Sequence, residues 1–133
     1  MIVLDASAAV AMLVSNTDDG EVARHAVATH SLAYPTLLAY EVASTLRRLA
    51  AAGHISDDRA SVSLERAVGL PGTAIDLDAV WPRVWELRHS VTSYDAAYVA
   101  LAELLDVPLL TFDRKLRSAP GVRCRFYEPP AGG

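Results

Sequence analysis

The first five residues constrain the fold of this chain more than any other stretch. Ile2, Val3 and Leu4 form a short apolar run without a turn residue, and Asp5 follows directly. The shortness of the run and its β-branched residues favour a strand buried on both faces. Ser7 is a good helix N-cap, so we expect a helix to begin about two residues after the strand. Asp5 would then lie at the carboxyl end of a central strand, where open α/β sheets bind their ligands.

Short apolar runs and helical patterns alternate along the rest of the chain. Further short strands are predicted at 31–34, 73–77 and 107–112, with a candidate edge strand at 123–127. Helices are predicted at 7–14, 21–30, 35–52, 56–69, 78–90 and 92–104, with a helical turn at 114–116. Strands separated by helices are typical of βαβ units and a parallel sheet. We therefore expect one α/β domain over residues 1–127 and a short tail at 128–133.

Composition excludes several classes of protein. A net charge of −4 does not fit a general polyanion binder, although acids clustered around a metal ion would lower the charge in the same way. Cys124 is the single cysteine, so an internal disulfide is impossible and a reducing compartment is expected. The chain shows no signal-peptide pattern and no apolar run of about 18 residues. We expect a cytoplasmic protein with no membrane partner.

Four acidic residues stand at places where a ligand site could form. Asp5 and Asp113 follow predicted strands, Asp95 opens a predicted helix, and Glu41 lies within another. Each has an ordinary structural explanation. Asp5 and Asp113 could cap the segments that follow them, and Asp95 could complete a capping box with Thr92.

Glu41 is the acid with the weakest ordinary explanation. It lies at the border of an apolar helix face, and its neighbours at i+3 and i+4 are Ser44 and Thr45. No cation on the same helix can therefore pair with it. A solvated glutamate remains the alternative to a ligand-binding role.

The four acids mean more together than singly. The carboxyl ends of parallel strands share one edge of a sheet, which can bring Asp5 and Asp113 side by side, but spacing alone leaves open whether Asp95 joins them. Two carboxylates at about 4 Å repel each other by roughly 4 kcal/mol at an effective dielectric constant near 20. A cluster therefore requires raised pKa values or a bound cation. Oxygen ligands alone favour Mg²⁺ or Mn²⁺ over Zn²⁺.

The segments that carry these acids resemble one known family. They are Val-Leu-Asp-Ala-Ser at 3–7, Pro35 with Glu41-Val42, Ser-Tyr-Asp-Ala-Ala-Tyr-Val-Ala-Leu-Ala at 93–102, and Leu-Thr-Phe-Asp-Arg-Lys-Leu at 110–116. In this order they resemble the PIN domain and, more narrowly, the VapC toxins of bacterial type II toxin–antitoxin pairs. The resemblance extends from Met1 to about Tyr127.

This resemblance implies a three-layer α/β/α sandwich with a Rossmann-like parallel sheet, and a metal-dependent endoribonuclease. It implies that Asp5, Glu41, Asp95 and Asp113 are catalytic, with Asp5 and Asp95 as the ligands of Mg²⁺, for which Mn²⁺ could substitute. Ser7 and Thr111 match supporting hydroxyl positions. The implied partners are an RNA substrate, a VapB-type antitoxin and a second copy of the chain in a homodimer.

Basic residues gather after the 107–112 run. Arg114, Lys115 and Arg117 flank Asp113 and are candidates for binding the RNA backbone, with an ordinary solvated surface as the alternative. Trp81 and Trp85 lie four residues apart on one helix, which predicts a core or a dimer interface.

Other functions fit the sequence less well. A phosphatase of the haloacid dehalogenase type requires an aspartate where Ser7 stands. A receiver domain requires an adjacent acidic pair and a distal lysine, whereas Lys115 is the single lysine. No G-x-G-x-x-G follows the first strand, so dinucleotide binding has no support. A non-catalytic RNA- or protein-binding module remains the main alternative.

Overall fold

A computed structural model describes residues 1–131 of the chain, and its centre is a four-stranded parallel sheet. The strands are β1 (Ile2–Leu4), β2 (Leu32–Pro35), β3 (Thr73–Ile75) and β4 (Leu109–Leu110), in the order β3-β2-β1-β4. Val3 pairs with Ala33 of β2 on one side and with Leu109 of β4 on the other. β1 is therefore an interior strand, and its three residues are fully buried, as the apolar run predicted.

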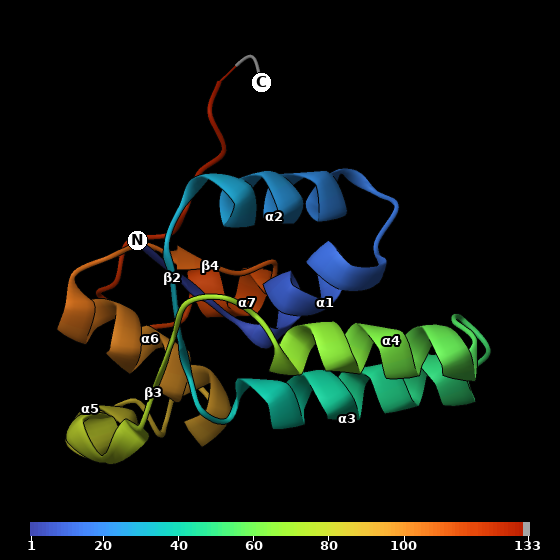
Figure 1. Ribbon diagram of the computed structural model, residues 1–133. Helices are drawn as coiled ribbons and strands as arrows, with labels where there is room; N and C mark the ends of the chain where they lie inside the picture. Colours follow the sequence, from blue (N-terminus) through green and yellow to red (C-terminus); the bar gives the residue numbers. More distant parts are fainter. Residues whose placement is uncertain (132–133) are drawn as a thin grey trace.

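Helices cover the sheet and form the α/β/α sandwich (Figure 1). The helices are α1 (Ala6–Val14), α2 (Asp18–Thr29), α3 (Leu38–Ala51), α4 (Asp57–Val68), α5 (Trp81–Glu86), α6 (Ser93–Leu105) and α7 (Arg114–Arg117), with a 3₁₀ turn η1 (Leu77–Val80) before α5. α6 packs against β1, β2 and β4, and α5 packs against α6. α1 packs against α2, α3 and α4. The predicted fold class is confirmed.

α6 is the most deeply buried helix. Seven consecutive residues, 96–102, are buried, so the helix is enclosed on all sides rather than along one stripe. Four of the seven are alanines, whose small side chains let the sheet and α5 approach closely. The first turn of α6 is exposed or half-buried, which leaves Asp95 at the surface end of an otherwise enclosed helix.

Several predicted boundaries were wrong. Ser7 lies inside α1, because Asp5 takes the N-cap position and its side chain accepts the Ala8 amide hydrogen. The helix predicted at 35–52 begins at Leu38, since Pro35 still belongs to β2, where it pairs with Ile75.

The later elements are shorter than predicted. The helix predicted at 78–90 is divided into η1 and α5 and ends at Glu86. Of the run 107–112, only two residues form β4. The segment 123–127 contributes a single bridge from Phe126 to Leu109 instead of an edge strand. Trp81 and Trp85 are 53% and 63% exposed, so they are not core residues.

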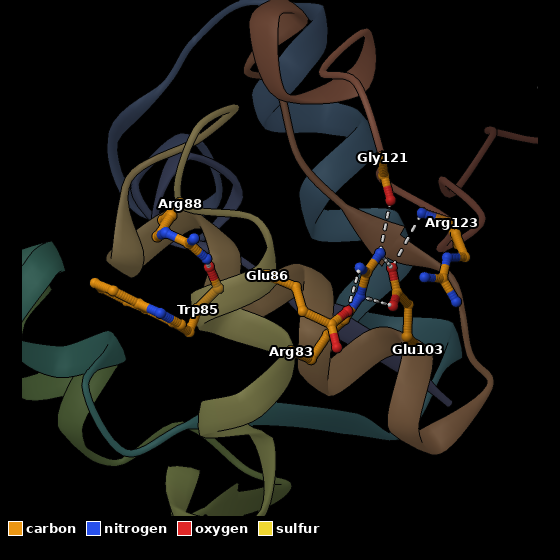
Figure 2. A network of polar contacts seen from close by, with 7 residues as sticks. All are labelled: Arg83, Trp85, Glu86, Arg88, Glu103, Gly121 and Arg123. Carbon is orange, nitrogen blue, oxygen red and sulfur yellow. Dashed lines mark hydrogen bonds and ion pairs between the residues drawn. The ribbon is translucent and has the colours of Figure 1, made fainter.

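A polar network fastens the segment after α7 to the helices (Figure 2). The Arg83 guanidinium donates two hydrogen bonds to the Glu103 carboxylate, at 2.7 and 3.1 Å, and one to the Gly121 carbonyl at 2.6 Å. The Arg123 amide also donates to Glu103, at 3.0 Å. The network joins α5, α6 and residues 121–123, far from the carboxyl edge of the sheet.

The predicted tail at 128–133 lies partly outside the described residues, which end at Ala131. Residues 128–131 form no helix or strand. Between Met1 and Ala131, no helix is both long and apolar enough to cross a membrane.

Candidate active site

Four elements deliver the four predicted acids toward the carboxyl edge of the sheet. Asp5 follows β1, Asp113 follows β4, and Glu41 and Asp95 lie in the first turns of α3 and α6. The carboxylates are close enough to perturb one another. Asp95 raises the pKa of Asp5, both raise the pKa of Glu41, and Asp113 raises that of Asp95. The geometric question that the spacing left open is therefore answered, because Asp95 does come to this edge.

Asp5 is the most enclosed of the four, with 4% of its surface exposed. Its Oδ1 accepts hydrogen bonds from the Ala8 amide at 2.9 Å and from the Ser7 hydroxyl at 2.7 Å. Burial raises the pKa of the Asp5 carboxyl. The hydroxyls of Thr111 and Ser7 and the Ala8 amide lower it by less, so the net pKa is raised. Asp5 thus caps α1 through one oxygen.

Ser7 and Thr111 form a chain of hydroxyl contacts that ties the end of β4 to Asp5. Ser7 Oγ accepts from the Phe112 amide at 3.0 Å and lies 3.4 Å from Thr111 Oγ1. Thr111 Oγ1 in turn accepts from the Asp113 amide at 3.1 Å. The Ser7 hydroxyl donates its one hydrogen to Asp5, and the Thr111 hydroxyl is close enough to Asp5 to lower the pKa of its carboxyl. Both predicted supporting hydroxyls therefore lie beside Asp5.

Glu41 faces the buried phenol of Tyr98. Within residues 1–131, neither Glu41 Oε1 nor the Tyr98 hydroxyl has a hydrogen-bond partner of good geometry, although both atoms are buried. Each still affects the other: burial raises the pKa of Glu41 most, and the Tyr98 hydroxyl lowers it by less. Buried polar atoms without partners are rare in proteins and indicate a place for a water molecule or an ion.

Asp95 and Asp113 also have local structural roles. The Asp95 amide donates to the Thr92 hydroxyl at 3.2 Å, so Thr92 caps α6. Asp113 Oδ1 accepts from the amides of Lys115 and Leu116, which caps α7. Burial raises the pKa of Asp95 first and the Asp113 carboxylate raises it further, against a lowering by Thr92. Capping alone would not bring these two acids together.

Two hollows open beside the acids. One, of about 430 Å³, contains Asp95 and Asp113, and the other, of about 350 Å³, contains Glu41. The first hollow is lined by Arg88, His89, Ser90, Val91, Thr92, Asp95, Asp113, Lys115 and Leu116.

Of the three predicted RNA-binding residues, one lines the first hollow. Lys115 does so, and Arg114 is exposed outside it. Arg117 contacts Glu128 and lies 5.2 Å from the centre of the Phe126 ring, so its guanidinium is engaged elsewhere. Arg88, which the sequence did not single out, lines the same hollow as Lys115.

The donor set fits a hard cation such as Mg²⁺. All its side-chain donors are oxygens, and no ion pair within residues 1–131 involves any of the four acids. Three of the acids have raised pKa values and one has a buried oxygen without a partner. The described residues hold no ready group of three metal-ligating side chains, so the carboxylates would have to turn inward to enclose an ion.

Comparisons with known proteins agree with this geometry. The PIN domain family model matches residues 2–122. Ribonuclease VapC9 of Mycobacterium tuberculosis is 39% identical over 132 residues, which cover 98% of this chain and 99% of the relative. The chain therefore belongs to the PIN domain family and, within it, to the VapC ribonucleases.

Solved structures agree on the fold. The Mycobacterium tuberculosis VapC20 toxin, described as cleaving the sarcin–ricin loop, superposes with a TM-score of 0.68 at 15% identity, over 88% of this chain and 93% of that one. VapBC2 from Rickettsia felis, solved with a DNA fragment from its promoter, gives 0.66 at 13% identity, over 96% and 100%. At these identities the likeness supports the architecture alone.

Proposed function

We propose that this chain is a metal-dependent endoribonuclease toxin that hydrolyses RNA phosphodiester bonds. The observation that carries the proposal is the convergence of Asp5, Glu41, Asp95 and Asp113 from four separate elements. Burial and mutual repulsion disfavour three of these charges in the absence of a cation. A fold tolerates such a cluster where function requires it. The VapC relatives support the same activity.

Each acid has a role in this proposal. Asp5 and Asp95 would hold Mg²⁺, or Mn²⁺ in its place, and Ser7 and Thr111 would fix the orientation of Asp5. When bound, the cation would stabilise negative charge on the phosphate and lower the pKa of a water molecule. Glu41 and Asp113 would orient the attacking water, for which the partnerless Glu41 oxygen is available. No histidine or lysine is needed as a base.

Basic side chains near the four acids are the candidates for binding the RNA phosphates. Lys115 lines the hollow that holds Asp95 and Asp113, so it could contact a phosphate beside the bond that is cut. Arg88 lines the same hollow, but it would have to leave Trp85, whose carbonyl accepts a hydrogen bond from its guanidinium at 2.9 Å and whose ring lies 4.7 Å away. Arg114 could contribute from outside the hollow. We assign Arg117 a smaller part, because it already contacts Glu128.

We further propose that a VapB-type antitoxin neutralises the toxin by covering the acidic edge, and that the toxin forms a homodimer. The support is membership of the VapC ribonucleases, together with a fold shared with VapBC2 of Rickettsia felis. A cytoplasmic site of action agrees with an RNA substrate and with the single, half-buried Cys124.

A cleavage assay on total cellular RNA tests the proposed function. The protein, freed of antitoxin, would be incubated with Mg²⁺, with Mn²⁺ and with excess chelator, alongside Asp5→Asn. Asparagine can still cap α1, so this variant keeps the fold while it loses the charge. We expect discrete fragments that require metal and are absent with the variant.

Full activity of Asp5→Asn, or equal cleavage in chelator, would contradict the proposal. Absence of both cleavage and Mg²⁺ binding by calorimetry would favour the alternative of a non-catalytic binding module. The phosphatase alternative has lost its basis, because Ser7 hydrogen-bonds Asp5 at the position where that class requires an acid.

A further inference from the structure

The five tyrosines of the chain divide into two sets. Tyr34, Tyr98 and Tyr127 serve the fold: Tyr98 and Tyr127 are buried, and the Tyr34 hydroxyl donates to the Leu70 carbonyl at 2.7 Å. Tyr40 and Tyr94 are 80% and 62% exposed. Burying an aromatic side chain stabilises a protein by roughly 1.5–3 kcal/mol, so rings left in solvent contribute little to stability. Their position calls for another explanation.

Both exposed tyrosines stand next to an acid of the candidate active site. Tyr40 precedes Glu41 in the first turn of α3, and Tyr94 precedes Asp95 in the first turn of α6. The two helices are distant in sequence, yet both tyrosines line the 350 Å³ hollow that contains Glu41. The remaining lining residues are Ser44, Thr45 and Arg48. The hollow therefore combines two tyrosines, two hydroxyl side chains and one arginine next to Glu41.

We propose that Tyr40 and Tyr94 form a stacking subsite for unpaired bases of the RNA substrate, with Arg48 binding the adjoining phosphate. This inference rests on the proposed ribonuclease function. Bases of single-stranded RNA stack on aromatic side chains, and each such contact contributes about 1–3 kcal/mol. A volume of about 350 Å³ is within the usual range for a small-molecule site, so the hollow can hold a base rather than a helix or strand of a protein.

Arg48 is placed to complete the subsite without neutralising the acids. It lies seven residues after Glu41 on α3, which corresponds to about 10 Å of helix rise. Its Nη2 donates to Thr45 Oγ1 at 3.2 Å, and it forms no ion pair with Glu41 in the described part of the chain. A phosphate beside Arg48 would thus be a different one from the phosphate at the acids. Charge and aromatic character together fit a nucleotide strand better than an apolar protein segment.

The subsite also implies how the RNA strand would run across the molecule, from one hollow to the other. Lys115 and Arg88 line the hollow on the Asp95–Asp113 side, and the tyrosines line the hollow on the Glu41 side. Phosphate contacts would dominate on the first side and base stacking on the second. The bond to be cut would lie between them, with unpaired bases on the tyrosine side.

Binding measurements in an Asp5→Asn background would test the subsite without cleavage. The probe is a single-stranded RNA 10-mer with 2-aminopurine at successive positions, whose fluorescence is quenched by stacking. We expect Tyr40→Ala and Tyr94→Ala each to weaken binding by about 5- to 100-fold and to relieve the quenching. Tyr40→Phe and Tyr94→Phe should retain both. Tyr94→Leu, which keeps apolar bulk without an aromatic face, should behave like Tyr94→Ala.

Two controls separate stacking from general effects. Leu104→Ala removes an exposed apolar side chain at the opposite end of α6 and should leave binding unchanged. Arg48→Gln should reduce the slope of log affinity against log salt by about 0.7, the value for one phosphate on single-stranded RNA. Arg47→Gln, an exposed neighbour that does not line the hollow, should leave the slope unchanged.

In otherwise active protein, the alanine variants should raise KM for RNA with little change in kcat. Alanine variants that bind and cleave like Leu104→Ala would overturn the subsite, and so would phenylalanine variants as weak as alanine. An Asp5→Asn protein that fails to bind the probe would also overturn it, since stacking requires no particular sequence. The ribonuclease function is tested separately, by the loss of cleavage in Asp5→Asn. That result would stand even if the tyrosine variants showed that the stacking subsite does not exist.

Discussion

At the scale of single residues, the Tyr98 hydroxyl is buried without a hydrogen-bond partner of good geometry among residues 1–131, and it faces Glu41 of the candidate site. An unpaired buried hydroxyl costs about 1–3 kcal/mol, so we expect Tyr98→Phe to melt at or above the wild-type temperature. Because the hydroxyl faces Glu41, we also expect its loss to slow RNA cleavage by about tenfold, the usual effect of removing a group that orients a site residue. Thermal melting and cleavage rates measure the two effects.

Tyr34→Phe is the matched control for that experiment. It removes a hydroxyl that does have a partner, the Leu70 carbonyl, and should cost about 0.5–1.5 kcal/mol of stability with little change in cleavage. A Tyr98→Phe protein that loses stability like this control and cleaves normally would show that the Tyr98 hydroxyl has only a structural role.

Asp95 is a residue whose charge lowers the stability of the fold. Its charged form is disfavoured by burial and by Asp113, so we expect Asp95→Asn to raise the melting temperature in chelator at pH 7. The same variant should lose the rise in melting temperature that Mg²⁺ gives the wild type. Glu65→Gln, an exposed change on α4, should alter neither. A lower melting temperature for Asp95→Asn in chelator would contradict the repulsion described above.

At the scale of elements, the Arg83–Glu103 pair holds α5, α6 and residues 121–123 together. The side chains of Arg83 and Glu103 are only 18% and 17% exposed, and Glu103 accepts three hydrogen bonds. We expect Glu103→Gln to destabilise the protein by about 1–3 kcal/mol at pH 7, measured by urea denaturation. Glu86→Gln, which breaks the exposed ion pair of the same arginine, should cost less than 1 kcal/mol.

The pH dependence of this pair has a definite sign. Burial raises the pKa of Glu103, but hydrogen bonds from Arg83 and the Arg123 amide lower it by more, so the folded value is below the ordinary 4.5. The stabilisation is therefore fully present above about pH 4.5 and is lost as the pH falls through the lower folded value. The stability difference between wild type and Glu103→Gln should stay constant from pH 7 to 5 and shrink below that. A difference that grows on acidification would exclude this interpretation.

The end of α6 carries a backbone conformation that a glycine would adopt more easily. Asp106 has φ 53° and ψ 50°, the left-handed region, where a residue with a Cβ costs about 1 kcal/mol more than glycine. Its exposed carboxylate lies 3.5 Å from Arg125, a weak pair. We therefore expect Asp106→Gly to stabilise the protein by about 0.5–1 kcal/mol in urea denaturation, without affecting cleavage. Destabilisation would mean that the Arg125 contact outweighs the backbone term.

Elements were predictable from sequence where local chemistry decides them, and less so where tertiary contacts do. Ser56 and Thr92 cap their helices as capping preferences predicted. Asp5 and Ser7 are both good N-caps, and local preference does not choose between them. In the structure Asp5 caps α1, and the Ser7 hydroxyl contacts Thr111, which is 104 positions further along the chain. The length of β4 depends on its neighbours in the sheet rather than on the apolar run 107–112.

The acidic site was predictable to a similar degree. Strand-end positions located Asp5 and Asp113, whereas the arrival of Asp95 depends on how α6 crosses the sheet, which spacing does not determine. Tyr40 and Tyr94 precede Glu41 and Asp95 in the sequence, but periodicity could not show that both tyrosines line one hollow or that Arg88 lines the hollow of Asp95 and Asp113. These neighbours meet only when α3, α6 and the segment after α5 are brought to one edge.

At the scale of the whole molecule, the last strand completes both the sheet and the candidate site. β4 covers the open edge of β1 and brings Thr111 and Asp113 to Asp5. We expect a chain truncated after Pro108 to lack a cooperative melting transition and RNA cleavage, because β1 would be an unpaired hydrophobic edge. Circular dichroism and the RNA assay would measure these properties. A folded, active truncation would show that β4 is dispensable.

This strand order has a consequence for synthesis in the cell. Translation adds about 5–20 residues per second, so the 104 positions between Ser7 and Thr111 take about 5–20 s to emerge from the ribosome. During that interval the nascent chain carries some of its acids but no assembled site. A growing polypeptide would therefore be harmless to the ribosome that makes it and to neighbouring transcripts, and nuclease activity would begin only after β4 has docked.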